Sequence, residues 1–207
     1  AFGGSGTALN VRTSWGEQMS SGFFGLLNAR DDVVVVNASL GYNWGPAGIN
    51  QNTSTAVHDL VEDQGAIFAL AELIYVLLGH DLPVFVVAAG NDSNDISNGT
   101  GGWVLMEARW ASPFAYAGIE LDMPNVIVVE SVANSAASAG GATRSSFSNI
   151  GADISAPGSD VMSTSWRSTN PTAFYENMSG TSMASPHVTG LISYLFTIDP
   201  SLLHSEI

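Results

Sequence analysis

The 207-residue sequence contains no cysteine and no lysine, and each absence excludes a class of function. Without cysteine, the chain has neither a disulfide framework nor a thiolate that could act as nucleophile or metal ligand. Only five basic side chains, all arginine, oppose 19 acidic ones, which gives a net charge of −14. So acidic a protein is not expected to bind nucleic acid, and its charge favours a well-solvated surface.

Long hydrophobic runs are also absent. The most apolar stretch, residues 66–79, is interrupted by Glu72 and closed by Gly79 and Pro83. It is too short to span a bilayer, so we interpret it as a buried helix. A composition that is 45% hydrophobic, with neither repeats nor low-complexity segments, predicts one globular domain.

Valine-rich runs alternate with a long helical pattern. The runs cover residues 33–37, 83–88 and 126–132, and the helix is expected at about 55–79. Such runs suit strands that are buried on both faces, so they predict a mainly parallel sheet flanked by helices, in an α/β fold. Ligands bind such sheets at the carboxyl ends of the strands. Shorter extended segments are expected to add antiparallel strands near 145–147, 153–156 and 161–165.

Residues 178–190 are the most informative stretch, because they place Ser182 at the start of a helix. Small residues before Ser182 permit a tight turn, and Pro186 is expected in the first helical turn, where its missing N–H costs little. A hydroxyl in this position lies beside unpaired N–H groups and the positive end of the helix dipole. This environment stabilises a developing oxyanion, so Ser182 is predicted to be a nucleophile.

The run from Gly180 to Val188 resembles the nucleophile motif of the subtilisin-like serine proteases, the subtilases. Other segments resemble, in the family's order, the strand that pairs with a bound peptide, the strand that delivers the oxyanion asparagine, and the run before the nucleophile. They are Val33 to Gly41, Val84 to Asn91, and Ser145 to Gly158. The resemblance extends from about Leu9 to about Asp199, with insertions near residues 42–54 and 92–123.

The resemblance implies a three-layer subtilisin-like fold and a secreted serine endopeptidase that forms a seryl acyl-enzyme. The Asn91 amide and the N–H of Ser182 would then hold the oxyanion. A peptide or protein substrate would lie between two backbone segments, here called the rails, made of Ser39, Leu40 and Gly41 and of Ala88, Ala89 and Gly90. The small residues favour an apolar side-chain pocket, which Tyr42, Asp92 and residues 110–113 are expected to shape.

A serine nucleophile needs a base, and the family's aspartate and histidine motifs are not found in this sequence. His187 is five positions beyond Ser182, which turns it by about 140° around the helix, so we expect it to be structural. His80 is expected at a helix end, and His58 and His204 at the surface. We therefore expect residues 1–207 to be a partial peptidase domain that lacks its N-terminal part, which would act as its partner, and that is inactive alone.

Other functions stay open. If the parent protein also lacks the aspartate and histidine, the chain would be a pseudoprotease serving as a peptide-binding or structural module. A nucleophile-elbow hydrolase is disfavoured, because no Gly-x-Ser-x-Gly surrounds Ser182. No cofactor is expected to be required, and no metal ligands are assigned. Calcium as a structural ion at residues 91–99 is an alternative to a solvated turn, although the spacing is not that of an EF-hand.

Overall fold

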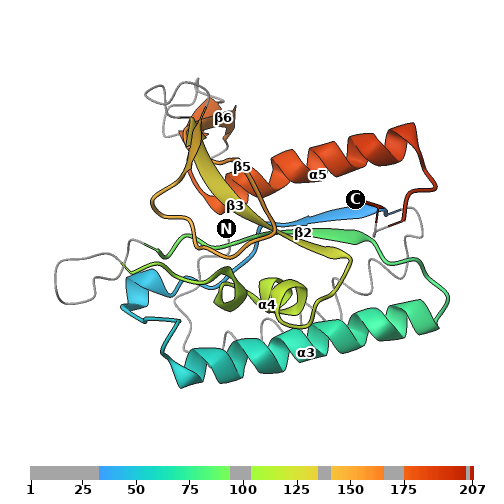
Figure 1. Ribbon diagram of the computed structural model, residues 1–207, viewed down its shortest axis with the longest axis horizontal. Coiled ribbons are helices and arrows are strands. Elements are labelled where there is room, and N and C mark those ends of the chain that lie inside the picture. The colour runs from blue at the N-terminus through green and yellow to red at the C-terminus, as the bar shows by residue number, and fades with distance from the viewer. Residues whose placement is uncertain (1–32, 94–103, 135–140, 166–174, 204–205) are drawn as a thin grey trace.

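The computed structural model describes residues 33–93, 104–134, 141–165, 175–203 and 206–207. The described part has three layers, with a sheet between helix α5 on one face and helices α3 and α4 on the other (Figure 1). The helices are α3 (Thr55–Leu77), α4 (Pro113–Ile119) and α5 (Thr181–Ile198), with short 3₁₀ turns η2 (Gly45–Ala47) and η3 (Ala108–Trp110). This arrangement confirms the predicted three-layer α/β architecture.

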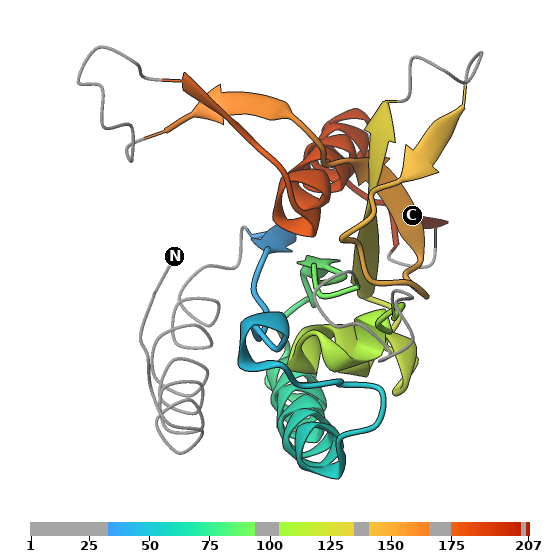
Figure 2. The same ribbon diagram turned by 90° about the vertical axis from the view of Figure 1, so that its left-hand side faces the viewer.

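The main sheet has the order β1-β2-β3-β4, and β5 also pairs with β3. Its strands are β1 (Val35–Ala38), β2 (Val84–Ala88), β3 (Val126–Asn134), β4 (Ala142–Arg144) and β5 (Ile154–Pro157). The first three strands are parallel, with Val35 opposite Val84 and Phe85 opposite Val126, as the valine-rich runs predict. A separate antiparallel pair, β6 (Val161–Thr164) and β7 (Tyr175–Met178), projects beyond the start of α5 (Figure 2).

Two strand predictions were wrong. Residues 145–147 form a turn, closed by the bond from Ser148 N–H to Ser145 O at 2.9 Å, and the antiparallel strand is β4, just before it. Strand β5 is parallel to β3, although an antiparallel strand was expected. The chain after β4 runs back along β3 until Asp153 N–H bonds to Val128 O, so the next strand must start beside the first half of β3.

Strand β2 shows how the sheet is buried on both faces. Phe85 and Val87 point into a cluster with α3 and α4, whereas Val84 and Val86 point into a second cluster with α5. Successive side chains of a strand alternate between the two faces of the sheet, so each face receives its own set of valines and phenylalanines. The two clusters hold α3 and α5 on opposite sides of the same strand.

Helix α3 is buried along one face only, so the prediction of a buried helix was wrong for its outer face. Phe68, Glu72 and Tyr75 lie on the inner stripe, whereas the outer side of its second half is aliphatic and exposed. The exposed residues are Ile67, Leu70, Leu73, Ile74, Val76 and Leu77. Within the described residues, no helix is long and apolar enough to cross a membrane.

Candidate active site

The two rails leave neighbouring parallel strands at the same edge of the sheet. Residues 39–41 follow β1, and residues 88–90 start at the last residue of β2, with Ala38 paired to Val87. The start of α5 lies against both rails. Ser39 Oγ donates to the carbonyl of Ser182 at 3.1 Å, and the N–H of Gly90 donates to Thr181 Oγ1 at 3.1 Å. The sheet therefore brings three distant segments together at its carboxyl edge, as expected for a ligand site.

Helix α5 begins at Thr181, which makes Ser182 its second residue and leaves the N–H of Ser182 in the unpaired first turn. Pro186 is the sixth residue, so its expected position in the first turn was wrong. Proline has no N–H to donate to the carbonyl four residues earlier, and that carbonyl belongs to Ser182. The hydroxyl of Ser39 donates to it instead, so the missing helical bond becomes a link between the first rail and Ser182.

Asn91 is exposed and has a fixed orientation. Its Oδ1 accepts the N–H of Thr181 at 2.8 Å and the hydroxyl of Thr181 at 3.0 Å. A backbone N–H can only donate, so the amide oxygen must face Thr181 and the amide nitrogen must face away from it. The Nδ2 group is thereby left as a donor beside the start of α5, where a Cβ added to Gly180 would lie 3.5 Å from it.

The hydroxyl of Ser182 makes no hydrogen bond within the described part of the chain, and no histidine there reaches it. His187 is exposed, and its Nδ1 lies 2.9 Å from the carbonyl of Met183 on its own helix. Its place away from the face of Ser182 agrees with the 140° rotation. His204 lies outside the described residues.

His58 is not a surface residue, contrary to expectation. Its ring is half-buried and stacks on Trp110 with 3.8 Å between centroids, and its Nε2 lies 2.7 Å from the carbonyl of Gln51. His80 stacks on Tyr75 after the end of α3, at the opposite edge of the sheet. Both rings belong to aromatic packing and lie away from the start of α5.

Glycine is required where each rail approaches Ala111. A Cβ on Gly41 would lie 3.0 Å from the carbonyl oxygen of Ala111. A Cβ on Gly90 would lie 2.8 Å from the Cβ of Ala111 and 2.5 Å from Nδ2 of Asn149. Gly90 also has a φ of +93°, which side chains rarely adopt. Ala111 is buried and therefore backs both rails.

Asp92 is buried and fully engaged with protein donors. Its carboxylate accepts the N–H of Gly45 at 2.8 Å and Nε2 of Gln51 at 3.3 Å. In the candidate calcium segment 91–99, the side-chain oxygens of Asn91 and Asp92 thus already accept hydrogen bonds, and residues 94–99 lie outside the described residues. Among the residues that are described, no group of three or more carboxylates and histidines could hold a metal ion.

Sequence reasoning missed the supporting residues. Thr181 orients Asn91, and Asn149 accepts the N–H of Asp92 at 2.9 Å. Asn37 Oδ1 accepts the hydroxyl of Ser185 at 2.7 Å and so ties β1 to α5. Thr181 could have been found from its position next to Ser182. The other contacts join segments far apart in sequence, and no local pattern indicates them.

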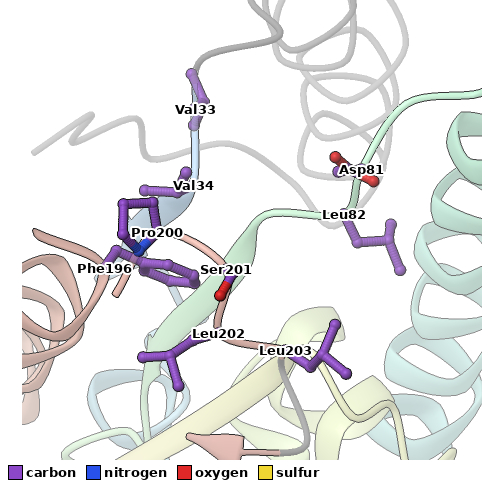
Figure 3. A pocket seen from close by; sticks show the side chains of 9 residues that line it. All are labelled: Val33, Val34, Asp81, Leu82, Phe196, Pro200, Ser201, Leu202 and Leu203. Atoms are coloured by element: carbon purple, nitrogen blue, oxygen red, sulfur yellow. The ribbon is translucent and has the colours of Figure 1, made fainter. Parts of the chain in front are cut away.

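A hollow of about 350 Å³ lies at the other edge of the sheet (Figure 3). It is lined by residues 33–34 and 81–82, which precede β1 and β2, by residue 196 in the last turn of α5, and by residues 200–203, which follow α5. The lining is mainly aliphatic and contains no nucleophile paired with a base. Since ligands bind parallel sheets at the carboxyl ends of the strands, this hollow is separate from the candidate site.

Comparison with known proteins shows which family this chain resembles in sequence. The model of the Subtilase family matches residues 6–207. Alkaline protease 1 of Emericella nidulans is 35% identical over 162 residues, which are 77% of this chain and 33% of that protein. The Extracellular protease of Xanthomonas campestris is 34% identical over 122 residues, which are 57% of this chain and 17% of that protein.

The solved structure of a cold-adapted subtilisin-like serine proteinase aligns with a TM-score of 0.50 and 28% sequence identity. The alignment covers 88% of this chain and 49% of that one. The chain thus spans about half the length of this neighbour and a third or less of the two relatives above.

Proposed function

This chain belongs to the subtilase family, and on that premise we propose that it carries the nucleophile and oxyanion half of a serine endopeptidase site. The observation that supports this most is the grouping at the start of α5. Ser182 has a free hydroxyl among the described residues, and the neighbouring Thr181 holds Asn91 with its Nδ2 available as a donor. On this proposal, residues 1–207 form part of a subtilisin-like peptidase domain.

In the proposed reaction, Ser182 Oγ attacks the carbonyl carbon of a peptide bond and loses its proton to a base. The carbonyl oxygen becomes an oxyanion, which the N–H of Ser182 and Nδ2 of Asn91 stabilise. Collapse of this intermediate breaks the C–N bond, the base returns the proton to the leaving amine, and the acyl group stays on Ser182. Water then hydrolyses the acyl-enzyme by the same steps in reverse order.

We propose that the base is a histidine, oriented by an aspartate, from polypeptide outside these 207 residues. The proposal is supported by the three described histidines, since each has a partner other than Ser182. His58 lies on Trp110, His80 on Tyr75, and His187 on the carbonyl of Met183. On this proposal the 207-residue chain alone does not hydrolyse peptides.

The proposed substrate is an extended peptide that pairs with the rails as an added strand. Gly41 and Gly90 let the rails pack closely against Ala111, which lies behind them and limits the depth of the space between the rails. A small apolar side chain fits such a space best. Since catalysis by a serine nucleophile needs no metal, we propose that no cofactor is required. Calcium bound at residues 91–99 as a structural ion is a separate proposal. A calorimetric titration with calcium that shows no binding heat would contradict it.

The experiment that tests the proposed function is a peptidase assay on a longer polypeptide that joins this chain to the family's aspartate and histidine segments. We expect cleavage of a denatured protein substrate, abolished by Ser182→Ala. The matched control is Ser193→Ala, because Ser193 lies on the same helix and donates only to the carbonyl of Thr189. Loss of cleavage in both variants, or in neither, would contradict the role of Ser182.

A pseudoprotease is the second candidate, favoured because the histidines among the described residues all have partners other than Ser182. It predicts that the longer polypeptide binds peptides between the rails without cleaving them. We also propose secretion, because one relative is named an extracellular protease. Detection of the protein only inside the producing cells would contradict secretion.

A further inference from the structure

Three serine hydroxyls form a hydrogen-bonded chain beneath the turn that leads to the nucleophile. Ser131 on β3 and Ser145, just after β4, have their Oγ atoms 2.7 Å apart. The Oγ of Ser145 also lies 2.8 Å from the Oγ of Ser159, which follows β5. Ser131 is 0% exposed and Ser145 is 3% exposed, whereas Ser159 is half-buried. The hydroxyls thus join the interior of β3 to two later segments of the chain.

The burial of these hydroxyls determines the direction of their hydrogen bonds. Each serine hydroxyl has one proton to donate and can also accept protons. If the donations ran from Ser159 toward Ser131, the proton of Ser131 would be left without an acceptor, because within the described residues its hydroxyl bonds only to Ser145. An unpaired donor in the interior is costly. Ser131 therefore donates to Ser145, and Ser145 donates to Ser159, whose half-buried hydroxyl can donate to water.

Gly158, the residue before Ser159, connects β3 to the turn before the nucleophile. Its N–H donates to the carbonyl of Val132 on β3 at 3.0 Å, and its carbonyl accepts the N–H of Gly180 at 2.8 Å. Gly180 immediately precedes α5, in which Ser182 is the second residue. A displacement of Gly158 is therefore transmitted to the backbone two residues before the nucleophile.

Gly158 also has side-chain and backbone atoms close to it. A Cβ added there would lie 2.4 Å from Oγ of Ser131 and 2.7 Å from the carbonyl oxygen of Gly180. The hydroxyl of Ser131 thus occupies the space beside Gly158 where a side chain would otherwise lie. Two residues further on, the N–H of Asp160 donates to Oγ of Ser179 at 2.9 Å. The turn before the nucleophile is therefore bonded at two points to the segment that the hydroxyl chain holds.

We propose that Ser131, Ser145 and Ser159 are positioning residues whose hydrogen-bonded hydroxyls fix Gly158 and thereby the position of Ser182. This inference rests on the proposed function, since it assigns supporting residues to the same nucleophile. The three hydroxyls act through the backbone and not on the substrate. Misplacing a reacting group by about 1 Å can lower a rate by about 100-fold, so a small shift of this support is expected to reduce turnover.

The direction of the hydrogen bonds distinguishes two variants. In Ser145→Ala, the buried hydroxyl of Ser131 loses its acceptor. In the double variant, Ser131→Ala with Ser145→Ala, both partners are apolar and no buried donor is left unpaired. In urea unfolding we expect the equilibrium constant for unfolding to be about tenfold larger for the single variant than for the double variant. An equal or smaller constant for the single variant would show that Ser131 does not depend on Ser145, and would overturn the inference.

Amide hydrogen exchange on the 207-residue chain tests whether the hydroxyls hold the turn, without any need for activity. In the double variant we expect the N–H of Gly180 to exchange about fivefold faster or more, relative to the amides of β2, which report on global opening. The reason is that the Gly158 carbonyl, its acceptor, is no longer fixed. The control is Ser146→Ala, which removes an exposed hydroxyl next to Ser145. Unchanged relative exchange at Gly180 in the double variant would overturn the inference.

Steady-state kinetics of the longer, catalytically complete polypeptide tests the consequence for the nucleophile. A lower fold stability alone does not change the turnover of the molecules that remain folded, whereas a displaced nucleophile lowers kcat while substrate binding is retained. In the double variant we expect kcat to fall by about fivefold or more and KM to stay within about twofold, with both unchanged in Ser146→Ala. An active original protein whose kcat is unchanged in the double variant would overturn this inference alone. An original protein that does not cleave peptides would overturn the proposed function and the positioning role together.

Discussion

Two carboxyl groups are buried at opposite edges of the sheet, and their surroundings differ. Asp92, at the carboxyl edge, accepts hydrogen bonds from Gly45 and Gln51. Glu72, on the inner face of α3, is 2% exposed, and neither of its carboxyl oxygens has a hydrogen-bond partner among the described residues. Burial raises the pKa of Glu72 to about 8, a shift that the amide of Asn125 partly opposes.

The difference distinguishes the edge that carries the candidate site from the other edge of the sheet. At the carboxyl edge, loop N–H groups and amide side chains orient Asn91 and Asp92 in one position each. At the other edge, burial outweighs the effect of the Asn125 amide, so Glu72 stays protonated in the folded chain at neutral pH. The hydrogen bonds at the carboxyl edge fix the side chains of the candidate site, whereas the burial of Glu72 only lowers the stability of the fold. Substitutions at the two edges should therefore have different effects.

The largest effect is expected for Asn91→Ala in the catalytically complete polypeptide. Removing one oxyanion donor lowers turnover by about 100- to 1000-fold in subtilisin, a protease of this family, and we expect a loss in that range with little change in KM. Steady-state kinetics against Asn177→Ala, an exposed asparagine on β7, provides the comparison. A loss below about tenfold would remove Asn91 from the oxyanion site.

Glu72→Gln should change the pH dependence of stability. The folded chain holds the Glu72 proton up to about pH 8, whereas the unfolded chain releases it near pH 4.5. The stability contributed by the protonated group is therefore fully present below pH 4.5 and is lost as the pH rises through 8, by about 1.4 kcal/mol per pH unit between these values.

Glutamine does not titrate, so the stability of Glu72→Gln relative to the original chain should rise by about 3 kcal/mol between pH 4 and pH 7. Urea unfolding at several pH values measures this difference, and Glu62→Gln, an exposed residue of the same helix, is the control. If the difference does not change with pH, Glu72 is not the buried acid described here.

Two glycines with positive φ allow the edges to be compared directly. Gly90, at the carboxyl edge, has a φ of +93°, and an added Cβ would lie 2.5 Å from Asn149 Nδ2. Gly79, at the other edge, has a φ of +85°, and an added Cβ would meet nothing within 4 Å. We expect Gly79→Ala to cost about 1 kcal/mol from backbone strain and Gly90→Ala about 3 kcal/mol, because a steric clash is added. Equal costs in denaturant unfolding would mean that the rail is not closely packed.

The smallest effect is expected on the outer face of α3. Leu70 is 56% exposed, so Leu70→Gln should change the free energy of unfolding by no more than about 0.5 kcal/mol. Phe68→Ala, on the inner face of the same helix, should cost about 3 to 5 kcal/mol. A large cost at Leu70 would show that other polypeptide covers this face, and that Glu72 is not buried by its inner contacts alone.

The parts predicted well from the sequence are those with strong local patterns. The valine runs gave the three parallel strands, since only buried strands tolerate such runs. The small residues before Ser182 correctly indicated the start of a helix. The roles of Ser182, Asn91 and the rails stay predictions, because the structure gives their positions but not their chemistry.

The errors arose where distant contacts override local preference. The direction of β5 depends on how the chain returns along β3, and the burial of His58 depends on Trp110 from another segment. Pro186 lies in the second turn because α5 starts earlier than the proline rule suggests, and the bond from Ser39 satisfies the carbonyl that it leaves free. The aliphatic outer face of α3 could not be told from a buried one by hydrophobicity alone.

The most direct test of the account is the intact mass of this chain after exposure to a fluorophosphonate, which modifies only an activated serine. We expect no adduct on the 207-residue chain. We expect a single adduct, absent in Ser182→Ala, on the longer polypeptide that contains the family's aspartate and histidine. An adduct on the 207-residue chain would show that a base is already present, and an unmodified Ser182 in the longer polypeptide would show that this site is not a serine protease nucleophile.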